Sequence, residues 1–372
     1  MTKDNFGTWL EIDLDILRSN FTRIRELSQT KVMPIVKANA YGHGLDRIAT
    51  ELESAGAEWL GVARIEEALS LREIGVNTKL LVLGYTPPTR VSHAINHDIS
   101  LTVYDFRVVN EYVKHANGMN KSVNLHAKID TGMGRLGVLP ENGFDFIKLI
   151  DTKNHLRLEG LFTHFACADE PNKTATQNQI RQFDKVLNQL EEANIECPLI
   201  HASNSAGFIN FDQARFDMVR AGIALYGHAP AHGTPLPDGI YPIVSWKTRL
   251  ISIKQLPAGH GISYGHQYHT QNNEKIGVVA VGYGDGLRRR SGNHVLIRGK
   301  KVPIVGNVCM DQCMVQLDGI DDARIGDEVV IIGEQNNAMI SATDIADDWG
   351  TINYEVLCGL AARMPRYYFN GK

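Results

Sequence analysis

The sequence predicts an α/β fold in which an N-terminal (β/α)8 TIM barrel is followed by a mostly-β C-terminal domain. Up to about residue 228, short apolar strands alternate with amphipathic helices. Roughly eight strands separated by helices is the number that a TIM barrel needs. Beyond residue 242 the strands follow one another through short turns, which is typical of a mostly-β domain. The alternation alone would also fit a doubly wound sheet.

The barrel strands are predicted from apolar segments of strand length. They are VMPIV before Lys37, 59–63, 80–84, 100–104, 123–129, 158–165, 198–203 and 222–227. The clearest helix is predicted over 174–193, where apolar side chains recur at three- and four-residue spacing, namely Ile180, Phe183, Val186, Leu187 and Leu190.

A stretch rich in proline and glycine, APAHGTPLPDGIYP at 229–242, marks the predicted domain boundary. We expect the barrel over 1–232, with the first strand as a candidate to pack with the C-terminal domain, and the mostly-β domain over 233–372. The latter contains one predicted helical element near 341–349.

The composition indicates a soluble enzyme of the cytoplasm. Hydrophobic residues make up 43% and charged residues 22%, and the net charge is −4, which gives no electrostatic reason to expect nucleic acid or an anionic membrane as partner. No long apolar run predicts a signal peptide or a membrane span. Five scattered cysteines, an odd number, favour reduced thiols.

Lys37 is the first candidate for chemistry, because it directly follows a strand that should be buried in the barrel. Side chains at the C-terminal ends of barrel strands face the active site. Burial lowers the pKa of a lysine, and the neutral amine can then attack an aldehyde. The small residues and glycines of the following ANAYGHG would let the backbone approach a ligand closely. The simpler interpretation is a lysine whose amine reaches solvent at a strand end.

The segment VKANAYGHG resembles the pyridoxal-phosphate lysine segment of the alanine racemase family. The resemblance continues, in the family's order, through KIDTGMGRLG, HASNSAG, MVRAGIALYG, ISYG, GYGDGLRR, VGNVCMDQ and TINYEVLC. It implies an isomerase that uses pyridoxal 5′-phosphate to racemise alanine, supplying D-alanine for peptidoglycan. Lys37 then corresponds to the Schiff-base lysine and to one of two catalytic bases. The phosphate contacts implied are Tyr41, Ser205, the backbone at Gly222 and Ile223, and Tyr354.

The glycines of DTGMGRLG match a dinucleotide fingerprint, G-x-G-x-x-G. That interpretation fails because a helix must open directly on the glycines, whereas here one can begin only at Pro140 or beyond. The resemblance instead implies a loop that presents Arg135 to the substrate carboxylate and the cofactor, helped by the backbone N–H of Met310. Asp311 is expected to support this site.

Arg220 corresponds to the family's residue opposite the pyridine nitrogen of the cofactor. A guanidinium only donates hydrogen bonds, so the ring nitrogen must stay unprotonated, which limits delocalisation of a carbanion and suits a racemase. Lys128 matches a lysine that is carbamylated in many members, and the carbamate would orient Arg135. The alternative is that Lys128 pairs with Asp130 or another acid.

Racemisation requires proton exchange on both faces of the α-carbon, which two opposed bases achieve simply. The resemblance implies that Tyr264 is the second base and that His164 links Tyr264 to Arg220. Lys37 would exchange the proton of D-alanine and Tyr264 that of L-alanine. The resemblance also implies a head-to-tail homodimer in which each subunit completes the other's site.

Three rival functions follow from related architectures. A serine racemase is disfavoured because Tyr354 should fill the space beside the substrate's small side chain. A non-catalytic carrier of the cofactor would lack the second domain, and a barrel-type decarboxylase would place an acid at the ring nitrogen. No metal is expected: Cys309 and Cys313 lack the paired spacing of a zinc site, and His266 and His269 should face opposite sides of a strand. One departure is Asn307, where most members have arginine, which leaves the charge of the substrate entry open.

Overall fold

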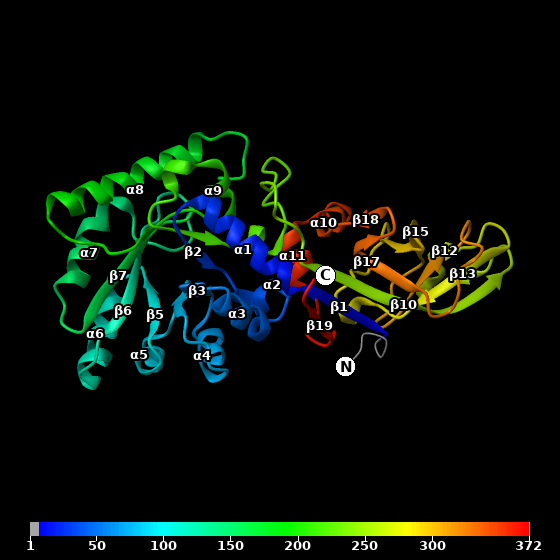
Figure 1. Ribbon diagram of the computed structural model, residues 1–372, viewed down its shortest axis with the longest axis horizontal. Helices are drawn as coiled ribbons and strands as arrows, with labels where there is room; N and C mark the ends of the chain where they lie inside the picture. The colour runs from blue at the N-terminus through cyan, green and yellow to red at the C-terminus, as the bar shows by residue number, and fades with distance from the viewer. Residues whose placement is uncertain (1–6, 372) are drawn as a thin grey trace. The chain divides into compact units, whose positions relative to one another are not determined.

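The computed structural model describes residues 7–371 and divides the chain into two compact units (Figure 1). The barrel unit comprises Leu17–Ala40 and Leu45–Tyr241. The C-terminal unit comprises residues 7–16, Tyr41–Gly44 and residues 242–371. The chain therefore enters the C-terminal unit three times.

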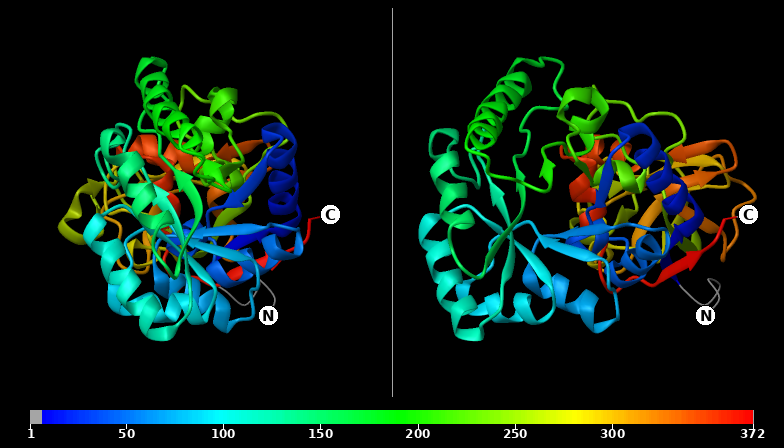
Figure 2. Two further views of the ribbon diagram at one scale, coloured as in Figure 1. Left: turned by 90° about the vertical axis from the view of Figure 1, so that its left-hand side faces the viewer. Right: turned by 60° about the vertical axis from the view of Figure 1, so that its left-hand side comes forward.

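Within the described residues, eight parallel strands form the barrel unit, and Figure 2 shows helices on their outer side. They are β2 (Lys31–Pro34), β3 (Trp59–Val62), β4 (Lys79–Val82), β5 (Ile99–Val103), β6 (Val123–Lys128), β7 (Leu156–Phe162), β8 (Ile200–His201) and β9 (Met218–Ala221). Strands β3 to β8 pair in order, and β2 pairs with β9. A bridge between Ile35 and Gly61 joins β2 to β3, and the Arg220 N–H donates to Ser203 O across 3.0 Å beside β8. The ring of strands is closed, and the predicted barrel is confirmed.

Helices separate the barrel strands, as the alternation predicts. They are α1 (Leu14–Ser28), α2 (Lys37–Tyr41), α3 (Leu45–Ser54), α4 (Ile65–Glu73), α5 (Val91–Asn96), α6 (Phe106–Met119), α7 (Gly143–Asp151), α8 (Thr174–Glu192) and α9 (Ser205–Asn210), with short 3-10 turns η2 (Pro88–Arg90), η3 (Pro140–Asn142), η4 (Asp212–Ala214) and η5 (Ile223–Tyr226). The helix predicted over 174–193 is α8, and Ile180, Phe183, Val186 and Leu190 are buried on one face. Burying each of these large apolar side chains contributes about 1.5–3 kcal/mol.

The strand predicted at 222–227 is wrong. The eighth strand is β9, which ends at Ala221, and the next residues form η5. Ile223, Ala224, Leu225 and Tyr226 are all fully buried, so an apolar run of this length fits a buried turn as well as a strand. Gly227, with φ 80° and ψ 29°, turns the chain out of η5.

A large, mostly antiparallel sheet dominates the C-terminal unit. Its strands, in spatial order, are β18 (Ala338–Ile340), β17 (Glu328–Gln335), β14 (His294–Ile297), β15 (Lys300–Val305), β16 (Cys313–Gln316), β13 (Glu274–Val279), β10 (Val244–Leu256), β1 (Thr8–Asp13) and β19 (Arg366–Phe369). A small ribbon of β11 (Gly261–Ile262) and β12 (Tyr268–His269), turns η6 (Tyr264–His266) and η7 (Tyr283–Asp285), and helices α10 (Ala342–Trp349) and α11 (Asn353–Cys358) complete it. The helix predicted near 341–349 is α10, and α11 was not predicted.

Strand β1 belongs to the sheet of the C-terminal unit, although it precedes the barrel in sequence. It pairs antiparallel with β10, where Thr8 opposes Thr248, and parallel with β19. Trp9 and Trp246 are among the most buried large side chains of the chain.

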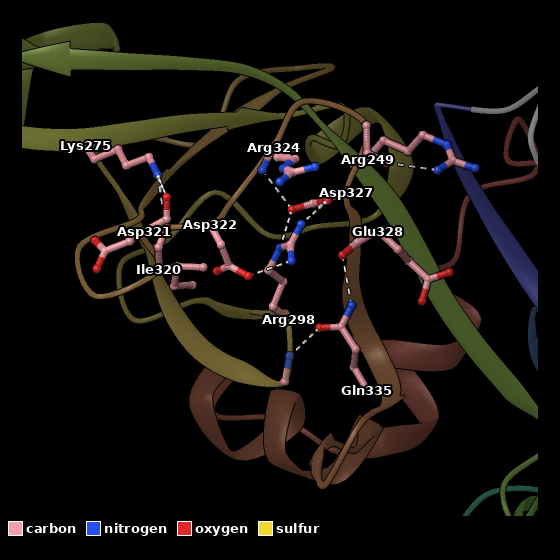
Figure 3. A network of polar contacts seen from close by, with 12 residues as sticks. Arg249, Lys275, Arg298, Ile320, Asp321, Asp322, Arg324, Asp327, Glu328 and Gln335 are labelled. Atoms are coloured by element: carbon pink, nitrogen blue, oxygen red, sulfur yellow. Dashed lines mark hydrogen bonds and ion pairs between the residues drawn. The ribbon is translucent and has the colours of Figure 1, made fainter.

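An ion-pair network ties the turn between β14 and β15 to the segment before β17 (Figure 3). The Arg298 guanidinium donates to both carboxylate oxygens of Asp327, at 2.7 and 3.0 Å, and to Asp322 at 2.7 Å. Burial opposes ionisation of Asp327, but the hydrogen bonds from Arg298 and from the Arg324 N–H, with the charges of both arginines, together lower the pKa of this carboxyl. Such a bidentate pair adds geometric definition to a turn.

Among the described helices, none is long and apolar enough to span a membrane.

Candidate active site

Lys37 stands directly after the first barrel strand and is half-buried. The residues before it, Val32 to Val36, are buried in the barrel. Its charge is among those that lower the pKa values of Lys128 and His164, which places these three side chains in one electrostatic environment inside the barrel unit.

The four residues that follow Lys37 form a left-handed turn. Ala38, Asn39, Ala40 and Tyr41 have φ values of 54°, 56°, 52° and 53°. This conformation costs about 1–2 kcal/mol for each residue with a Cβ. Strain of this kind persists only where the surroundings hold it, and it gathers at functional sites.

Glu67, at the start of α4, holds this turn and was not found by sequence reasoning. Its Oε1 accepts a hydrogen bond from the Ala38 N–H at 2.7 Å. Its Oε2 accepts from the N–H groups of Ala63, at 2.7 Å, and Arg64, at 3.1 Å. In sequence, Glu67 resembles an ordinary helix-capping carboxylate.

Arg220, on β9, is the most thoroughly anchored of the predicted site residues, with 3% of its surface exposed. Its Nη2 donates to the carbonyls of Ala202, at 2.6 Å, and Thr163, at 2.8 Å, and contacts His164 Nδ1 at 3.1 Å. Its Nη1 contacts His201 Nδ1 at 2.8 Å. The Nε–H takes no part in these four bonds and can donate to a ligand.

Both histidines beside Arg220 are neutral. Burial, followed by the charge of Arg220, holds the pKa of His164 and of His201 well below the usual range. Because a guanidinium has only donors, the Nδ1 atom of each ring must accept, and each ring carries its proton on Nε2.

Lys128, at the end of β6, is a buried amine among other cations. Burial, and then the charges of Arg220 and Arg135, lower its pKa to about 7. The amine lies 5.1 Å from the centre of the Phe162 ring. A lowered pKa favours the neutral, and hence nucleophilic, form of the Lys128 amine.

The loop that carries Arg135 is shaped by Asp130, which sequence reasoning considered only as a partner of Lys128. One carboxylate oxygen accepts from the N–H groups of Gly132, Met133 and Gly134, and the other accepts from the N–H of Arg135 at 3.0 Å. The Arg135 side chain is exposed. The helix that follows begins at Pro140, so the rejection of a dinucleotide fingerprint is confirmed.

Two backbone N–H groups converge on the Ser205 hydroxyl oxygen at the end of the barrel strands. Gly222 N lies 3.1 Å and Ala224 N lies 3.3 Å from Ser205 Oγ. Ser205 itself is buried. Because its oxygen accepts these two bonds, the Ser205 hydroxyl can donate its hydrogen to a ligand such as a phosphate.

Tyr41 and Tyr354 belong to the C-terminal unit, where their ring centres lie 6.2 Å apart. Burial, and then the proximity of Tyr354, raises the pKa of Tyr41, which keeps its hydroxyl protonated. Segment 41–44 is anchored in that unit, since Arg366 donates to the Gly42 carbonyl at 2.8 and 3.0 Å. A Cβ on Gly42 would lie 2.1 Å from Leu357 O, so only glycine permits this contact with α11.

Tyr264 and Met310 of the C-terminal unit are unusually exposed for large apolar side chains, at 70% and 53%. Ser263, at φ 61°, precedes Tyr264 in the turn, and its hydroxyl donates to the Asn307 carbonyl at 2.6 Å. The Asn307 amide in turn donates to the Tyr264 carbonyl at 2.6 Å. These hydrogen bonds therefore fix the backbone at Tyr264, although its side chain is exposed to solvent.

The loop around Met310 is fastened by Arg363 and by close backbone packing. Arg363 donates to Asp285 and to the predicted supporting residue Asp311, at 2.8 Å each. The Gly284 N–H donates to Met310 O at 2.8 Å. A Cβ on Gly282 would lie 2.3 Å from the same oxygen, which makes glycine necessary there.

The expected opposition of His266 and His269 is wrong. His266 lies in η6 rather than on a strand, and the two ring centres are 6.0 Å apart. Gly265, at φ 71°, interrupts the extended backbone and brings the rings to one side. No group of three potential metal ligands occurs among residues 7–371.

The predicted site residues thus fall into two sets. Those of the barrel unit are Lys37, Lys128, Arg135, His164, Ser205, Arg220, Gly222 and Ile223, and those of the C-terminal unit are Tyr41, Tyr264, Met310, Asp311 and Tyr354.

Comparison with known proteins finds one family along almost the whole chain. Residues 12–230 match the family model described as "Alanine racemase, N-terminal domain", and residues 243–368 match "Alanine racemase, C-terminal domain". The alanine racemase of Halothermothrix orenii is 44% identical over 367 residues, covering 98% of this chain and 97% of that protein. That of Methanococcus maripaludis is 40% identical over 370 residues, covering 97% and 98%.

Solved structures give the same picture. The alanine racemase of Clostridium difficile 630 superposes with a TM-score of 0.93 at 40% identity, covering 98% of this chain and 96% of the other. The Bacillus anthracis enzyme with bound L-Ala-P has a TM-score of 0.93 at 39% identity, with coverages of 98% and 95%. A histidine racemase from Leuconostoc mesenteroides reaches 0.89 at 26% identity, covering 98% of each chain. Racemases of more than one amino acid therefore share this fold.

Proposed function

This chain belongs to the alanine racemase family, and we propose that it interconverts L-alanine and D-alanine with pyridoxal 5′-phosphate bound to Lys37. The observation that supports this most strongly is Arg220, a buried guanidinium placed between two neutral histidines, with its Nε–H left for a ligand. A donor in this position suits a ring nitrogen that must accept a hydrogen bond and stay unprotonated.

The residues present fit the cofactor. Lys37 offers an amine at the end of a barrel strand. In the barrel unit, the Ser205 hydroxyl offers a donor to a phosphate. In the C-terminal unit, the resemblance assigns the same role to the hydroxyls of Tyr41 and Tyr354. When bound as an imine, pyridoxal 5′-phosphate acidifies the α-hydrogen of an amino acid.

Arg135 and the N–H of Met310 bind the substrate carboxylate in this proposal. Lys128 orients Arg135 after carbamylation, in which the neutral amine attacks carbon dioxide, one N–C bond forms and one proton leaves. The pKa of about 7 supplies the neutral amine that this step needs. The product is an anion, which relieves the concentration of positive charge around Arg220 and Arg135.

Two bases act on opposite faces of the α-carbon. We assign the amine of Lys37 to the proton of D-alanine and the phenol of Tyr264 to that of L-alanine, with His164 as the link between Tyr264 and Arg220. The large exposed fractions of Tyr264 and Met310 support a homodimer in which each subunit supplies these residues to the other's site.

We propose alanine as the preferred substrate because the resemblance implies that Tyr354 fills the space beside the substrate's small side chain and disfavours anything larger than a methyl group. The similarity to alanine racemases at 40–44% identity supports alanine rather than serine as the substrate. The histidine racemase neighbour makes a direct comparison of substrates necessary. A cofactor carrier is disfavoured because both domains of the racemases are matched.

A chiral assay tests the function. The purified protein is incubated with L- and D-alanine, and separately with serine and histidine, with and without added cofactor. We expect cofactor-dependent loss of configuration for alanine, with a visible absorption band that Lys37→Ala abolishes. Alanine that keeps its configuration despite this band would refute the proposal. We further propose a cytoplasmic location and a role in providing D-alanine for peptidoglycan, which D-alanine auxotrophy of a deletion strain would test.

A further inference from the structure

A buried chain of polar side chains leads from Arg220 across the interior of the barrel unit. His201 Nδ1 lies 2.8 Å from Arg220 Nη1, and His201 Nε2 lies 2.9 Å from His126 Nδ1. His126 Nε2 lies 3.6 Å from a carboxylate oxygen of Glu159. The exposed fraction is zero for both histidines, 3% for Arg220 and 8% for Glu159. The chain links four neighbouring strands, β9, β8, β6 and β7.

The two ends of this chain determine its direction. A guanidinium only donates, and a carboxylate only accepts. His201 must therefore accept on Nδ1 and donate from Nε2, and His126 must likewise accept on Nδ1 and donate from Nε2 towards Glu159. A neutral imidazole provides one donor and one acceptor, which matches both positions. Burial lowers the pKa of each ring, and for His126 this outweighs the opposing effect of Glu159.

Glu159 is well anchored as an anion. Its side chain accepts from Ser100 Oγ and from Lys79 Nζ, the latter at 3.1 Å. Burial opposes its ionisation, but the nearby His126 ring, 3.6 Å away, and the hydrogen bonds from Ser100 and Lys79 prevail and lower its pKa to about 2. The direct hydrogen-bond partners of Arg220 within the described chain are two carbonyls and two neutral rings. The carboxylate joined to Arg220 by this chain is thus that of Glu159.

Glu159 lies at the opposite end of the barrel from the predicted catalytic residues. It lines a pocket of about 200 Å³ together with Lys31, Trp59 and Lys79, which are the first residues of β2, β3 and β4. Lys37 and Ser205, in contrast, follow the last residues of their strands. The chain of side chains therefore connects the two mouths of the barrel.

We propose that His126 and Glu159 are positioning residues for Arg220, acting by holding His201 in the tautomer that accepts from the guanidinium. In the other tautomer, the His201 Nδ1–H would face the Arg220 Nη1–H, donor against donor, and Arg220 would have to move. The inference rests on the proposed role of Arg220 opposite the cofactor's ring nitrogen. The alternative is that the four residues only stabilise the barrel interior.

The first test measures the tautomers in the wild-type protein and uses substitutions only to assign signals. The full-length protein labelled with ¹⁵N-histidine is studied by NMR, with and without pyridoxal 5′-phosphate, and the His126 and His201 signals are assigned from single substitutions. We expect both rings to be neutral Nε2–H tautomers across the neutral pH range. A proton on Nδ1 of either ring would overturn the proposal whether or not the cofactor binds.

The second test compares Glu159→Gln with Lys79→Met, which removes another partner of the same carboxylate outside the chain. For Glu159→Gln we expect mixed His201 tautomers, a shifted ¹⁵N signal of the labelled cofactor's ring nitrogen, and a kcat about tenfold lower, with little change in KM. Lys79→Met should alter none of these. If Glu159→Gln lowers the Tm but leaves the tautomers, the ring-nitrogen signal and kcat unchanged, Glu159 has a structural role only and the proposal is refuted.

A third variant separates this inference from the proposed function. If Arg220→Lys leaves the ring-nitrogen signal of the wild-type holoenzyme unchanged, the assigned role of Arg220 fails, and the positioning role fails with it. If that signal responds to Arg220→Lys but not to Glu159→Gln, only the positioning role fails. Should Glu159→Gln not fold, His126→Gln is measured in its place, with the same expected and contrary outcomes.

Discussion

The side-chain amide of Asn307 donates a hydrogen bond to the backbone carbonyl of Tyr264 across 2.6 Å. The resemblance to the family leads us to expect arginine at this position, and in this chain a neutral amide holds the turn of the proposed second base. The Asn307 carbonyl also accepts from the Ser263 hydroxyl, and the two bonds tie the segments around residues 263 and 307 together.

Replacing Asn307 by alanine should therefore loosen Tyr264. We expect a loss of about 2- to 10-fold in kcat for L-alanine, which corresponds to one hydrogen bond, and a smaller loss for D-alanine. Chiral assays in both directions measure the ratio. Asn124→Ala, which removes a comparable amide bond to Asp98, is the control and should leave both rates unchanged. Equal rates in the two variants would contradict a holding role for Asn307.

Replacing Tyr264 by phenylalanine should remove the proposed base while keeping the shape of the side chain. General base catalysis contributes about 10²–10⁴-fold, and we expect a loss in this range for conversion of L-alanine. Solvent hydrogen exchange at the α-carbon should persist for D-alanine, because Lys37 is retained. Tyr241→Phe alters an exposed tyrosine of the barrel unit and serves as control. Near-normal racemisation in both directions by the Tyr264 variant would exclude the role.

Glu67→Gln should destabilise the left-handed turn after Lys37. The carboxylate accepts from three backbone N–H groups. The glutamine amide would place an NH₂ donor opposite at least one of these N–H donors. We expect about 1–3 kcal/mol lower stability in urea unfolding and weaker cofactor binding by absorbance titration. The neighbouring Glu66→Gln, at an exposed position, should change neither. If the Glu67 variant binds the cofactor with wild-type affinity, the left-handed turn does not depend on the Glu67 carboxylate.

Lys128 should make stability depend on pH. Its pKa is about 7 in the folded chain against a usual 10.5, so between these pH values the unfolded chain binds a proton that the folded chain does not. Stability therefore rises with pH across this window and is flat below it. Unfolding in carbon-dioxide-free buffer measures the slope, which Lys128→Met should remove. An unchanged slope in that variant would show that Lys128 does not carry the effect.

The same amine should react with carbon dioxide. Adding ¹³C-bicarbonate to the wild-type protein at mildly alkaline pH should give a carbamate signal in ¹³C NMR that is absent from Lys128→Met. Electron density for an unmodified amine under these conditions would count against carbamylation.

Arg363→Met should weaken substrate binding without affecting cofactor binding. The guanidinium fastens Asp285 and Asp311 beside Met310, and both carboxylates raise the pKa of Arg363, so the pair stays charged. We expect KM for alanine to rise about 2- to 10-fold. Arg298→Met removes a comparable two-carboxylate arginine elsewhere in the same unit and is the control. A rise in KM in both variants would indicate a general loss of order.

The sequence predicted the features that depend on pattern. Strand-helix alternation identified the barrel, and the apolar face of 174–193 identified its longest helix. The position of Lys37 after a buried strand indicates a reactive amine independently of the resemblance. These features follow from periodicity, which is local in sequence.

Features that depend on distant partners were missed. Ala38, Asn39 and Ala40 have no preference for a left-handed turn, and Glu67, which holds the turn, resembles an ordinary helix cap. Similarly, His126 and Glu159 look like isolated polar residues in apolar strands until the barrel brings them together. The strand predicted at 222–227 failed because a buried turn and a buried strand have the same apolar composition.

The pairing of β1 with both β10 and β19 has a consequence for biogenesis. The hydroxyl of Thr8 donates to Lys247, 239 residues away, and β19 begins only at Arg366. A ribosome must therefore make almost the entire polypeptide before β1 can be paired on both of its edges. Contacts of such sequence separation form slowly, and an unpaired strand edge invites aggregation in the meantime. Synthesis rate and chaperone supply should thus govern the yield of this protein more strongly than that of a barrel that closes as it emerges.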